Sequence, residues 1–286
     1  MRETSRFVRA GGLQWHCQIS GAGPSLVLIH GTGAATHTWR DIAPRLAKRH
    51  QVISFDLPGH GFTDPLPRGS AMLTRMSEAV AALLAQLKVA PVTIVGHSAG
   101  AAVAARLCLD GLASPHSLVG INGALLPPRW MPLNLYASLA RTMASSTLVP
   151  KFLAWGAKED SAIARMVAST GSEIDARGRE LYGRLVRNEV HVANVLAMLA
   201  GWDLAPLVAD LPRLDVPVLL ISAARDRTVP PEEAHRTRQL LPAGEVRELA
   251  DVGHLAHEER PEVVADVVLD HVERLLGSST GRPSGA

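Results

Sequence analysis

Short, continuously apolar runs alternate along the chain with longer stretches in which apolar residues recur every three or four positions. A continuous apolar run indicates a strand buried on both faces, as in a parallel sheet covered by helices. Six such runs occur: SLVLIH (25–30), QVISFD (51–56), VTIVG (92–96), LVGIN (118–122), PVLLIS (217–222) and VRELA (246–250). The pattern therefore predicts an α/β fold with a mostly parallel sheet.

Two of the intervening stretches carry the apolar stripe of a helix that packs on a sheet. The first stripe is Met76, Val80, Leu83, Leu84 and Leu87, and the second is Val264, Val267, Val268, Val272 and Leu275. Nearer the N-terminus, short runs around Phe7 and at 15–19 flank Gly11-Gly12. This spacing predicts an antiparallel hairpin at the edge of the sheet.

The alternation stops between residues 127 and 205, where helical patterns occur without a strand-like run. Open α/β sheets bind ligands beyond the carboxyl ends of their strands, and an insertion after the strand ending at Asn122 would cover that region. We therefore predict a core formed by 1–126 and 206–276 and a helical lid formed by 127–205. The Gly/Ser/Pro-rich end GSSTGRPSGA predicts a disordered tail at 277–286.

Composition and charge narrow the classes of function. Hydrophobic residues make up 47% and charged residues 20% of the chain, as in ordinary globular proteins. The 29 basic and 27 acidic residues are spread along the chain, so nucleic acid is not an expected partner. The polar start MRETSRFVRAGG lacks the apolar segment of a signal peptide, and no apolar run is long enough to span a membrane. We expect a cytoplasmic monomer or homodimer, for which attachment to a membrane surface stays open.

The pentapeptide GHSAG (96–100) interrupts the chain where a buried strand is expected to become a helix. It matches G-x-S-x-G, in which the serine occupies a sharp strand-to-helix turn and projects its hydroxyl above the sheet. Glycine two residues away on either side removes the side chains that would collide with this turn. The motif predicts Ser98 as a nucleophile, and the alternative is a serine that only caps the helix at 99–111.

A serine nucleophile needs a base, and the base needs a third group that holds its tautomer. The run PVLLIS leads to Asp226, and VRELA leads to His254, so both residues follow the carboxyl end of an expected strand. The order Ser98, Asp226, His254 is that of the hydrolases with this turn. Asp226 could instead pair with the arginine on either side of it, and Asp251 is the competing acid, although it lies close to His254 in sequence.

Acyl transfer also needs hydrogen-bond donors for the oxyanion, and the backbone amides of Ala99 and Thr32 are the candidates. The loop that contains Thr32 allows a different interpretation. The stretch GTGAAT (31–36) follows an expected strand and precedes Asp56 at roughly the distance typical of a dinucleotide-binding fold. However, Thr36 stands where the third glycine of that fingerprint would be, and a dinucleotide site would leave the three triad candidates unexplained.

No pattern in the chain matches a metal or cofactor site. Cys17 and Cys108 lack the paired spacing of zinc ligands, and their number is too small for a disulfide scaffold. His257 and Glu258 fit neither H-E-x-x-H nor H-x-x-E-H, and the phosphate-loop motif is absent from the sequence. We therefore expect no metal and no cofactor.

Five motifs carry a family resemblance: HGTG (30–33), DLPGHG (56–61), GHSAG (96–100), DRTVP (226–230) and GHLAHEERP (253–261). Together they make residues 5–276 resemble the lid-bearing α/β-hydrolases. The resemblance implies an eight-stranded sheet with a helical lid after the sixth strand. It also implies Ser98 as nucleophile, His254 as general base and acid, Asp226 as the orienting carboxylate, and Thr32 and Ala99 as oxyanion donors. Dehalogenases and epoxide hydrolases carry aspartate at the turn, so the serine argues against both.

A second set of stretches resembles the magnesium-chelatase accessory proteins of bacteriochlorophyll synthesis, which are α/β-hydrolase homologues. These stretches are GAGP (21–24), HGTGAATHTW (30–39), GINGAL (120–125), TGSEID (170–175) and HVANVLAMLAGWDL (191–204). The resemblance implies a role near magnesium insertion into protoporphyrin, with a tetrapyrrole as ligand and magnesium-chelatase subunits as partners. It does not imply a reaction.

The expected lid has aromatic and basic residues that suit a large, flat, partly acidic ligand. The candidate pocket residues are His30, Gly31, His97, Trp130, Tyr136, Phe152 and Trp155, and the arginines that could meet carboxylates are Arg165, Arg177, Arg179, Arg184 and Arg187. The alternative is that the apolar residues pack the lid onto the core and the arginines face water.

Two functions remain from the sequence. The first is a serine hydrolase that forms an acyl-enzyme with an ester, thioester, lactone or activated C–C bond of a small-molecule substrate. The second is a non-catalytic accessory or porphyrin-binding protein that assists magnesium chelatase.

Overall fold

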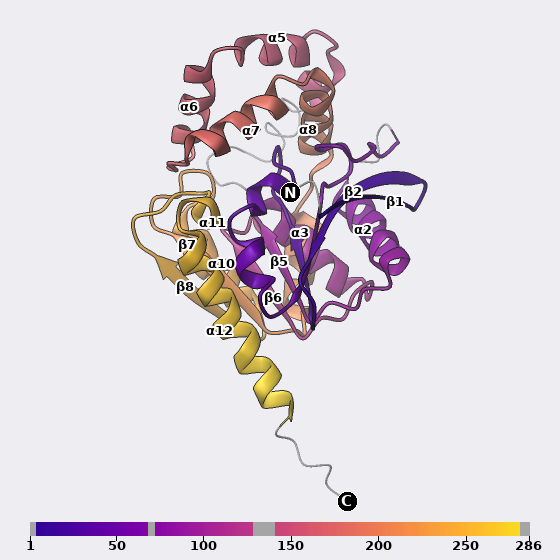
Figure 1. Ribbon diagram of the computed structural model, residues 1–286, viewed down its shortest axis with the longest axis vertical. Helices are drawn as coiled ribbons and strands as arrows, with labels where there is room; N and C mark the ends of the chain where they lie inside the picture. Colours follow the sequence, from indigo (N-terminus) through magenta and orange to yellow (C-terminus); the bar gives the residue numbers. More distant parts are fainter. Residues whose placement is uncertain (1–3, 68–71, 128–140, 281–286) are drawn as a thin grey trace, which may run out of the picture.

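The computed structural model describes residues 4–67, 72–127 and 141–280. Its centre is an eight-stranded sheet in the order β1-β2-β4-β3-β5-β6-β7-β8 (Figure 1). The strands are β1 (Ser5–Ala10), β2 (Leu13–Ser20), β3 (Ser25–Ile29), β4 (Gln51–Phe55), β5 (Thr93–His97), β6 (Ser117–Ile121), β7 (Val218–Ala223) and β8 (Gly244–Leu249). Neighbouring strands from β4 across to β8 are parallel, whereas β2 is antiparallel to both β1 and β4. The predicted α/β fold with a mostly parallel, eight-stranded sheet is confirmed.

The apolar runs mark the strands because the central strands are buried along their whole length. Every residue of β5, β6 and β7 is buried. The six predicted runs match observed strands to within two residues at each end. At the edge, β1 and β2 form the predicted hairpin, in which Gly11 and Gly12 have φ values of 56° and 81°. Glycine adopts these positive φ values without steric cost, so the tight turn can form.

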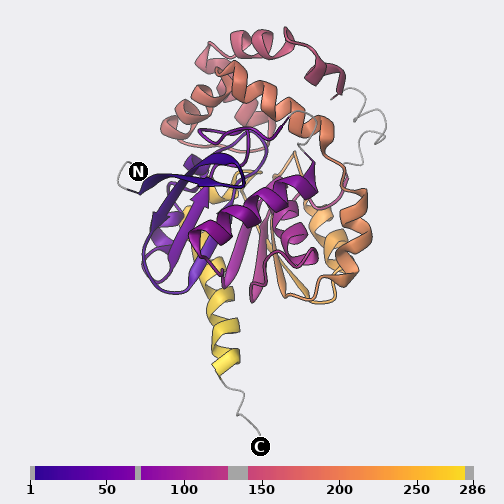
Figure 2. The same cartoon turned by 90° about the vertical axis from the view of Figure 1, so that its right-hand side faces the viewer.

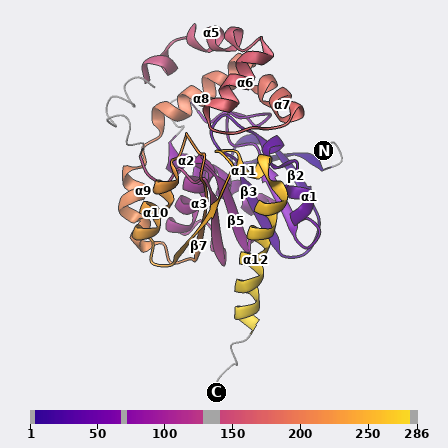
Figure 3. The same cartoon turned by 90° about the vertical axis from the view of Figure 1, so that its left-hand side faces the viewer.

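Helices cover both faces of the sheet and bury two separate apolar clusters (Figures 2 and 3). One face carries α2 (Leu73–Leu87), α3 (Ala99–Leu109), α9 (Ala205–Asp210) and α10 (Pro231–Leu240), and the other carries α1 (Ala43–Leu46), α11 (Ala256–Glu259) and α12 (Pro261–Thr280). The predicted stripes face the sheet, since Met76 and Val80 of α2 and Val264 and Val268 of α12 are buried. Two short 3₁₀ helices, η1 (Thr36–Trp39) and η2 (Leu211–Arg213), complete the core.

Four helices between β6 and β7 in sequence lie together over one end of the sheet (Figure 1). They are α5 (Val149–Gly156), α6 (Asp160–Ser169), α7 (Ala176–Val186) and α8 (Glu189–Gly201), and are called the α5–α8 layer below. A third apolar cluster includes Ile163, Val167 and Tyr182 of this layer together with Ala34 and Leu255 of the core. This cluster holds the layer over the loops that follow the carboxyl ends of the strands.

The C-terminal helix is longer than the sequence suggested. Helix α12 continues to Thr280, so residues 277–280, predicted to belong to a disordered tail, are helical, and the prediction is wrong for them. Serine and threonine lower helix propensity without ending a helix, and the first proline after α12 begins is Pro283. Residues 281–286 lie outside the described residues. Among the described helices, none is by itself long and apolar enough to cross a membrane.

Candidate active site

Ser98 occupies the sharp turn between β5 and α3. Its backbone has φ 51° and ψ −120°, a conformation that non-glycine residues rarely adopt, and its hydroxyl makes no capping hydrogen bond to α3. The flanking glycines are required because a Cβ on Gly96 would lie 2.4 Å from the Ala101 nitrogen, and one on Gly100 would lie 2.1 Å from the Ile29 oxygen. The simple helix-cap interpretation of Ser98 therefore does not describe this turn.

His254 and Asp226 form a buried hydrogen-bonded pair beyond the ends of β7 and β8. His254 Nδ1 donates to Asp226 Oδ2 at 2.8 Å. Asp226 Oδ1 accepts hydrogen bonds from the backbone amides of Thr228 at 2.7 Å and Val229 at 2.9 Å. With its acceptors used in this way, Asp226 holds the tautomer in which His254 Nε2 carries no proton. Asp251, the competing acid, is exposed, and no hydrogen bond or ion pair joins it to the His254 ring among the described residues.

Ser98 and His254 both line one cavity above the carboxyl ends of the strands. The described residues include no hydrogen bond from Ser98 Oγ to His254 Nε2. That nitrogen has no other protein partner within the described part of the chain, so it is free to accept a proton from a group in the cavity. Hydrogen bonds of this kind are commonly long without substrate and shorten when substrate binds.

The backbone of the histidine loop is held by two side chains near Ser98. His97 Nε2 donates to the His254 oxygen at 2.9 Å, and Asn122 Nδ2 donates to the same oxygen at 2.8 Å and to the Gly253 oxygen at 3.0 Å. Asn122 directly follows β6, and the Ala124 amide donates to the Ser98 oxygen at 3.0 Å. The end of β6 therefore fixes both the serine turn and the histidine loop.

Sequence reasoning missed Asn122. Its φ is 46°, and asparagine is one of the few residues besides glycine that tolerates this region. An asparagine just after a buried strand and before Gly123 is a weak signal for such a position.

Thr32 and Ala99, the predicted oxyanion donors, line the cavity beside Ser98. Neither backbone amide has a hydrogen-bond acceptor among the described residues, so both can donate to a ligand. The loop lies so close that a Cβ on Gly31 would be 2.9 Å from Ser98 Cβ. Its position is supported by His30, whose Nδ1 donates to the Gly31 oxygen at 2.8 Å while its Nε2 accepts from a backbone amide.

The cavity has a volume of about 1000 Å³ and lies between the sheet and the α5–α8 layer. Its lining is mostly apolar and includes Leu153, Met166, Tyr182, Val186, Leu196, Leu199 and Trp202. Glu232 and Glu233, at the start of α10, also line it, and both carboxylate oxygens of Glu233 accept hydrogen bonds from Arg236. Sequence reasoning placed none of these residues in the pocket, because helical periodicity identifies a buried face but not whether that face meets protein or an open cavity.

The predicted pocket residues have mixed outcomes. His97 lines the cavity, whereas His30 and Gly31 lie behind it and support the loop of Thr32. Trp130 and Tyr136 lie outside the described residues. Phe152 and Trp155 are 69% and 62% exposed and do not line the cavity, so their assignment is corrected. They lie three residues apart on the outer face of α5, and its neighbouring residue Leu153 is the one that reaches the cavity.

The five arginines proposed to meet ligand carboxylates do not line the cavity. Arg177 and Arg184 pair with Glu180 on the surface, and Arg187 pairs with Asp160. Arg177 and Arg184 therefore lie on the helix surface, as the alternative interpretation held, whereas Arg187 also donates to the Ala157 and Lys158 oxygens after α5.

The dinucleotide interpretation is not supported by the contacts of Asp56. Oδ1 accepts a hydrogen bond from the Thr36 amide at 2.7 Å, and Oδ2 contacts His16 Nδ1 at 2.8 Å and the Phe62 amide at 3.0 Å. The carboxylate is fully buried and already occupied by protein donors, so it cannot contact a ribose.

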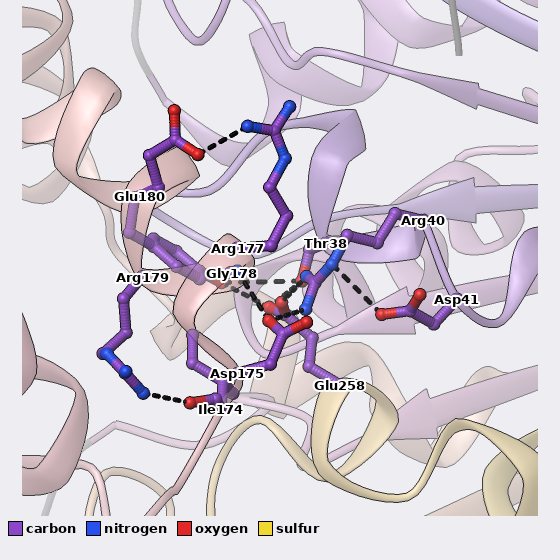
Figure 4. A network of polar contacts seen from close by, with 11 residues as sticks. Thr38, Arg40, Asp41, Ile174, Asp175, Arg177, Gly178, Arg179, Glu180 and Glu258 are labelled. Carbon is purple, nitrogen blue, oxygen red and sulfur yellow. Dashed lines mark hydrogen bonds and ion pairs between the residues drawn. The ribbon is translucent and has the colours of Figure 1, made fainter.

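A buried polar network ties the α5–α8 layer to the core beside the site (Figure 4). Glu258 accepts hydrogen bonds from Thr38 Oγ1 at 2.6 Å and from the Tyr182 hydroxyl at 2.8 Å, and forms an ion pair with Arg40. Arg40 also contacts Asp175, the N-cap residue of α7, at 2.8 Å. Because an unpaired buried charge is costly, these contacts couple the position of α7 to η1 and α11.

The histidines that surround the catalytic candidates are kept neutral. The His97 ring lies 4.8 Å from that of His254 and 4.4 Å from that of His257, between centroids. Burial lowers the pKa of His97 well below its ordinary value and that of His257 to about 3. Neutral neighbours do not repel the positive charge that His254 acquires when it accepts a proton. Within the described ranges, no group of three or more His, Cys, Asp or Glu side chains could hold a metal ion.

Comparison with known proteins identifies relatives over nearly the whole chain. A family model for the alpha/beta hydrolase fold matches residues 24–261. The magnesium-chelatase 30 kDa subunit of Rhodobacter capsulatus is 36% identical over 268 residues, which is 93% of each chain. Pyrrolizixenacetamide deacetylase of Xenorhabdus hominickii is 28% identical over 264 residues, covering 89% of this chain and 93% of that protein. An alpha/beta hydrolase fold protein from Burkholderia ambifaria has a TM-score of 0.77 at 25% identity, with coverage of 93% and 97%.

Proposed function

The chain belongs to the alpha/beta hydrolase fold family, and we propose that it is a serine hydrolase that works through an acyl-enzyme. The observation that carries the proposal is that Ser98 and His254 line one cavity, with Asp226 hydrogen-bonded to the far side of the His254 ring. The strained backbone of Ser98 supports it, because such strain is retained where a side chain must be presented to a ligand. The substrate is an ester, thioester, lactone or activated C–C bond, and the α5–α8 layer is the lid that selects it.

In the proposed mechanism, Ser98 Oγ attacks the substrate carbonyl while His254 Nε2 takes its proton. Asp226 stabilises the resulting imidazolium through the bond to Nδ1. The oxyanion accepts hydrogen bonds from the Thr32 and Ala99 amides, each of which is worth about 3 to 4 kcal/mol in related sites. His254 then donates the proton to the leaving group, and a water molecule activated by the same ring hydrolyses the acyl-enzyme.

Covalent labelling tests this proposal. A fluorophosphonate probe should modify the purified protein at Ser98, and the Ser98→Ala variant should not be labelled, because only an activated serine reacts with the probe. Labelling is measured by mass spectrometry of the intact chain and its peptides. The control Ser145→Ala, at an exposed serine, should label like the wild type. A folded protein that is neither labelled nor active on short activated esters would contradict the proposal.

Similarity to the magnesium-chelatase 30 kDa subunit favours a second candidate function. In this alternative, the protein assists magnesium chelatase by holding a tetrapyrrole in its large apolar cavity or by contacting a chelatase subunit, without hydrolysis. The test is pigment synthesis in a bacteriochlorophyll-forming host whose own copy of the gene is deleted. If hydrolysis is the function, the wild-type gene restores pigment and Ser98→Ala does not. Full restoration by Ser98→Ala would establish the accessory role instead.

A further inference from the structure

The outer face of α5 exposes a stripe of large apolar side chains. Leu148, Phe152 and Trp155 are 71%, 69% and 62% exposed. Their spacing of four and three residues places them on one face of the helix, and the rings of Phe152 and Trp155 lie 6.2 Å apart between centroids. We call these three residues the α5 stripe. Figures 1 and 3 show α5 at the extreme end of the molecule, where no other labelled element covers it.

The stripe is not a misplaced piece of core, because α5 already has a buried side. Pro150 and Ala154 are buried. Leu153 lines the cavity that contains Ser98. The helix therefore has two apolar sides. The side with Pro150 and Ala154 packs against the protein, and the side with the α5 stripe does not. Contiguous exposed apolar surface of this kind marks a site of interaction with a partner or a membrane.

Charge indicates which partner the stripe suits. From Arg141 to Lys158 the chain carries three basic residues and no acidic one, and the acidic Glu159 and Asp160 that follow form the start of α6. Lys151 and Lys158 are exposed and flank the stripe. Aromatic and leucine side chains with lysines beside them are typical of helices that lie in the interface of an anionic bilayer, where the lysine stems extend toward the lipid phosphates.

We propose that α5 docks the protein on an anionic membrane surface, with the α5 stripe inserted at the level of the lipid headgroups. The helix then lies between the bilayer and the cavity, because Leu153 lines the cavity from the same helix. The docking surface does not depend on the reaction at Ser98, so its test is independent of the proposed function.

Vesicle flotation with the full-length protein tests the proposal. The wild type should float with phosphatidylcholine vesicles that contain phosphatidylglycerol, and much less with phosphatidylcholine alone. Phe152→Ser/Trp155→Ser should weaken binding at least about tenfold, because it removes two large apolar side chains from the interface. Lys151→Glu/Lys158→Glu should abolish the preference for anionic vesicles.

A matched control is available at the N-terminal hairpin and the loop beside it. Phe7 and Phe62 are 58% and 73% exposed but lie outside α5, so Phe7→Ser/Phe62→Ser should bind vesicles like the wild type. Circular dichroism establishes that each variant is folded. Failure of the wild type to float with anionic vesicles, or equal binding by all variants, would overturn the proposal. If Phe152→Ser/Trp155→Ser instead converts a vesicle-free dimer into a monomer, the stripe is a contact between two copies and the membrane proposal is wrong.

Discussion

The Asp226→Asn variant is expected to lose about 10⁴-fold in kcat while remaining folded. Asp226 Oδ1 accepts two backbone amides, at Thr228 and Val229, and Oδ2 accepts His254 Nδ1. In the asparagine variant, the side-chain oxygen keeps the two amides and the NH₂ group replaces Oδ2. That NH₂ group is a donor, so His254 can pair with it only as the tautomer with a bare Nδ1. Nε2 then carries the proton and cannot accept one from Ser98.

The measurement is kcat and KM for an activated ester, with Asp251→Asn as the matched control. Asp251 is the competing acid, it is exposed, and its φ of 59° is tolerated by asparagine. We expect less than about a threefold change in kcat for Asp251→Asn, as for surface substitutions away from the site. Because the defect concerns proton transfer, KM of Asp226→Asn should change little. Equal loss in both variants would mean that the acid has been wrongly assigned.

The sequence predicted the fold and the serine turn well at positions where the backbone conformation or burial allows only a few residue types. A strained serine between Gly96 and Gly100 leaves few structural interpretations, and β5, β6 and β7 are apolar throughout because both faces of the sheet are covered. Asp226 and His254 were predicted as neighbours because each follows a parallel strand, and parallel strands bring their carboxyl ends to one edge of the sheet.

The cavity lining was much less predictable. Phe152 and Trp155 were assigned to the pocket because aromatic lid residues suit a large, flat ligand, yet they lie on the outer face of α5. Which face of a helix meets an open cavity depends on how the helices of the layer pack together. The role of Asn122 likewise depends on the distance between the end of β6 and the histidine loop, which no local pattern encodes.

The second large effect concerns acid stability. Burial is the first cause of a lowered pKa at seven histidines, including His191 and His271. The lowering is large at five of them: to about 4 at His30, to about 3 at His37 and His257, and well below the ordinary value at His60 and His97. In the unfolded chain each titrates near 6.5. Below that pH the unfolded state binds more protons than the folded state, so stability is full above pH 6.5 and falls as the pH decreases.

The expected size follows from the number of protons. Each histidine contributes about 1.4 kcal/mol per pH unit once its unfolded form is protonated, so five contribute about 7 kcal/mol by pH 5.5. Burial raises the pKa of Glu258, so on acidification the folded state binds a proton there before the unfolded state does. This stabilises the folded state, but it offsets only one of the five protons taken up by the histidines of the unfolded chain. Typical domains have only about 5–15 kcal/mol of stability in total. We therefore expect cooperative unfolding between about pH 6 and pH 5.

Urea unfolding at a series of pH values between neutrality and the acid transition gives the free energy of unfolding at each pH. The slope of that free energy against pH counts the excess protons bound by the unfolded state.

The His60→Asn variant supplies the critical comparison. His60 Nδ1 lies 3.2 Å from the Pro58 oxygen, and the asparagine amide can donate in its place, while the titrating ring is lost. The slope should fall by about one proton, or 1.4 kcal/mol per pH unit, whatever the change in stability at neutral pH. His116→Asn, at an exposed histidine, should leave the slope unchanged. A stability that stays flat down to acid pH would show that the core histidines accept protons without unfolding, and the neutral surroundings assigned to His254 would then be wrong.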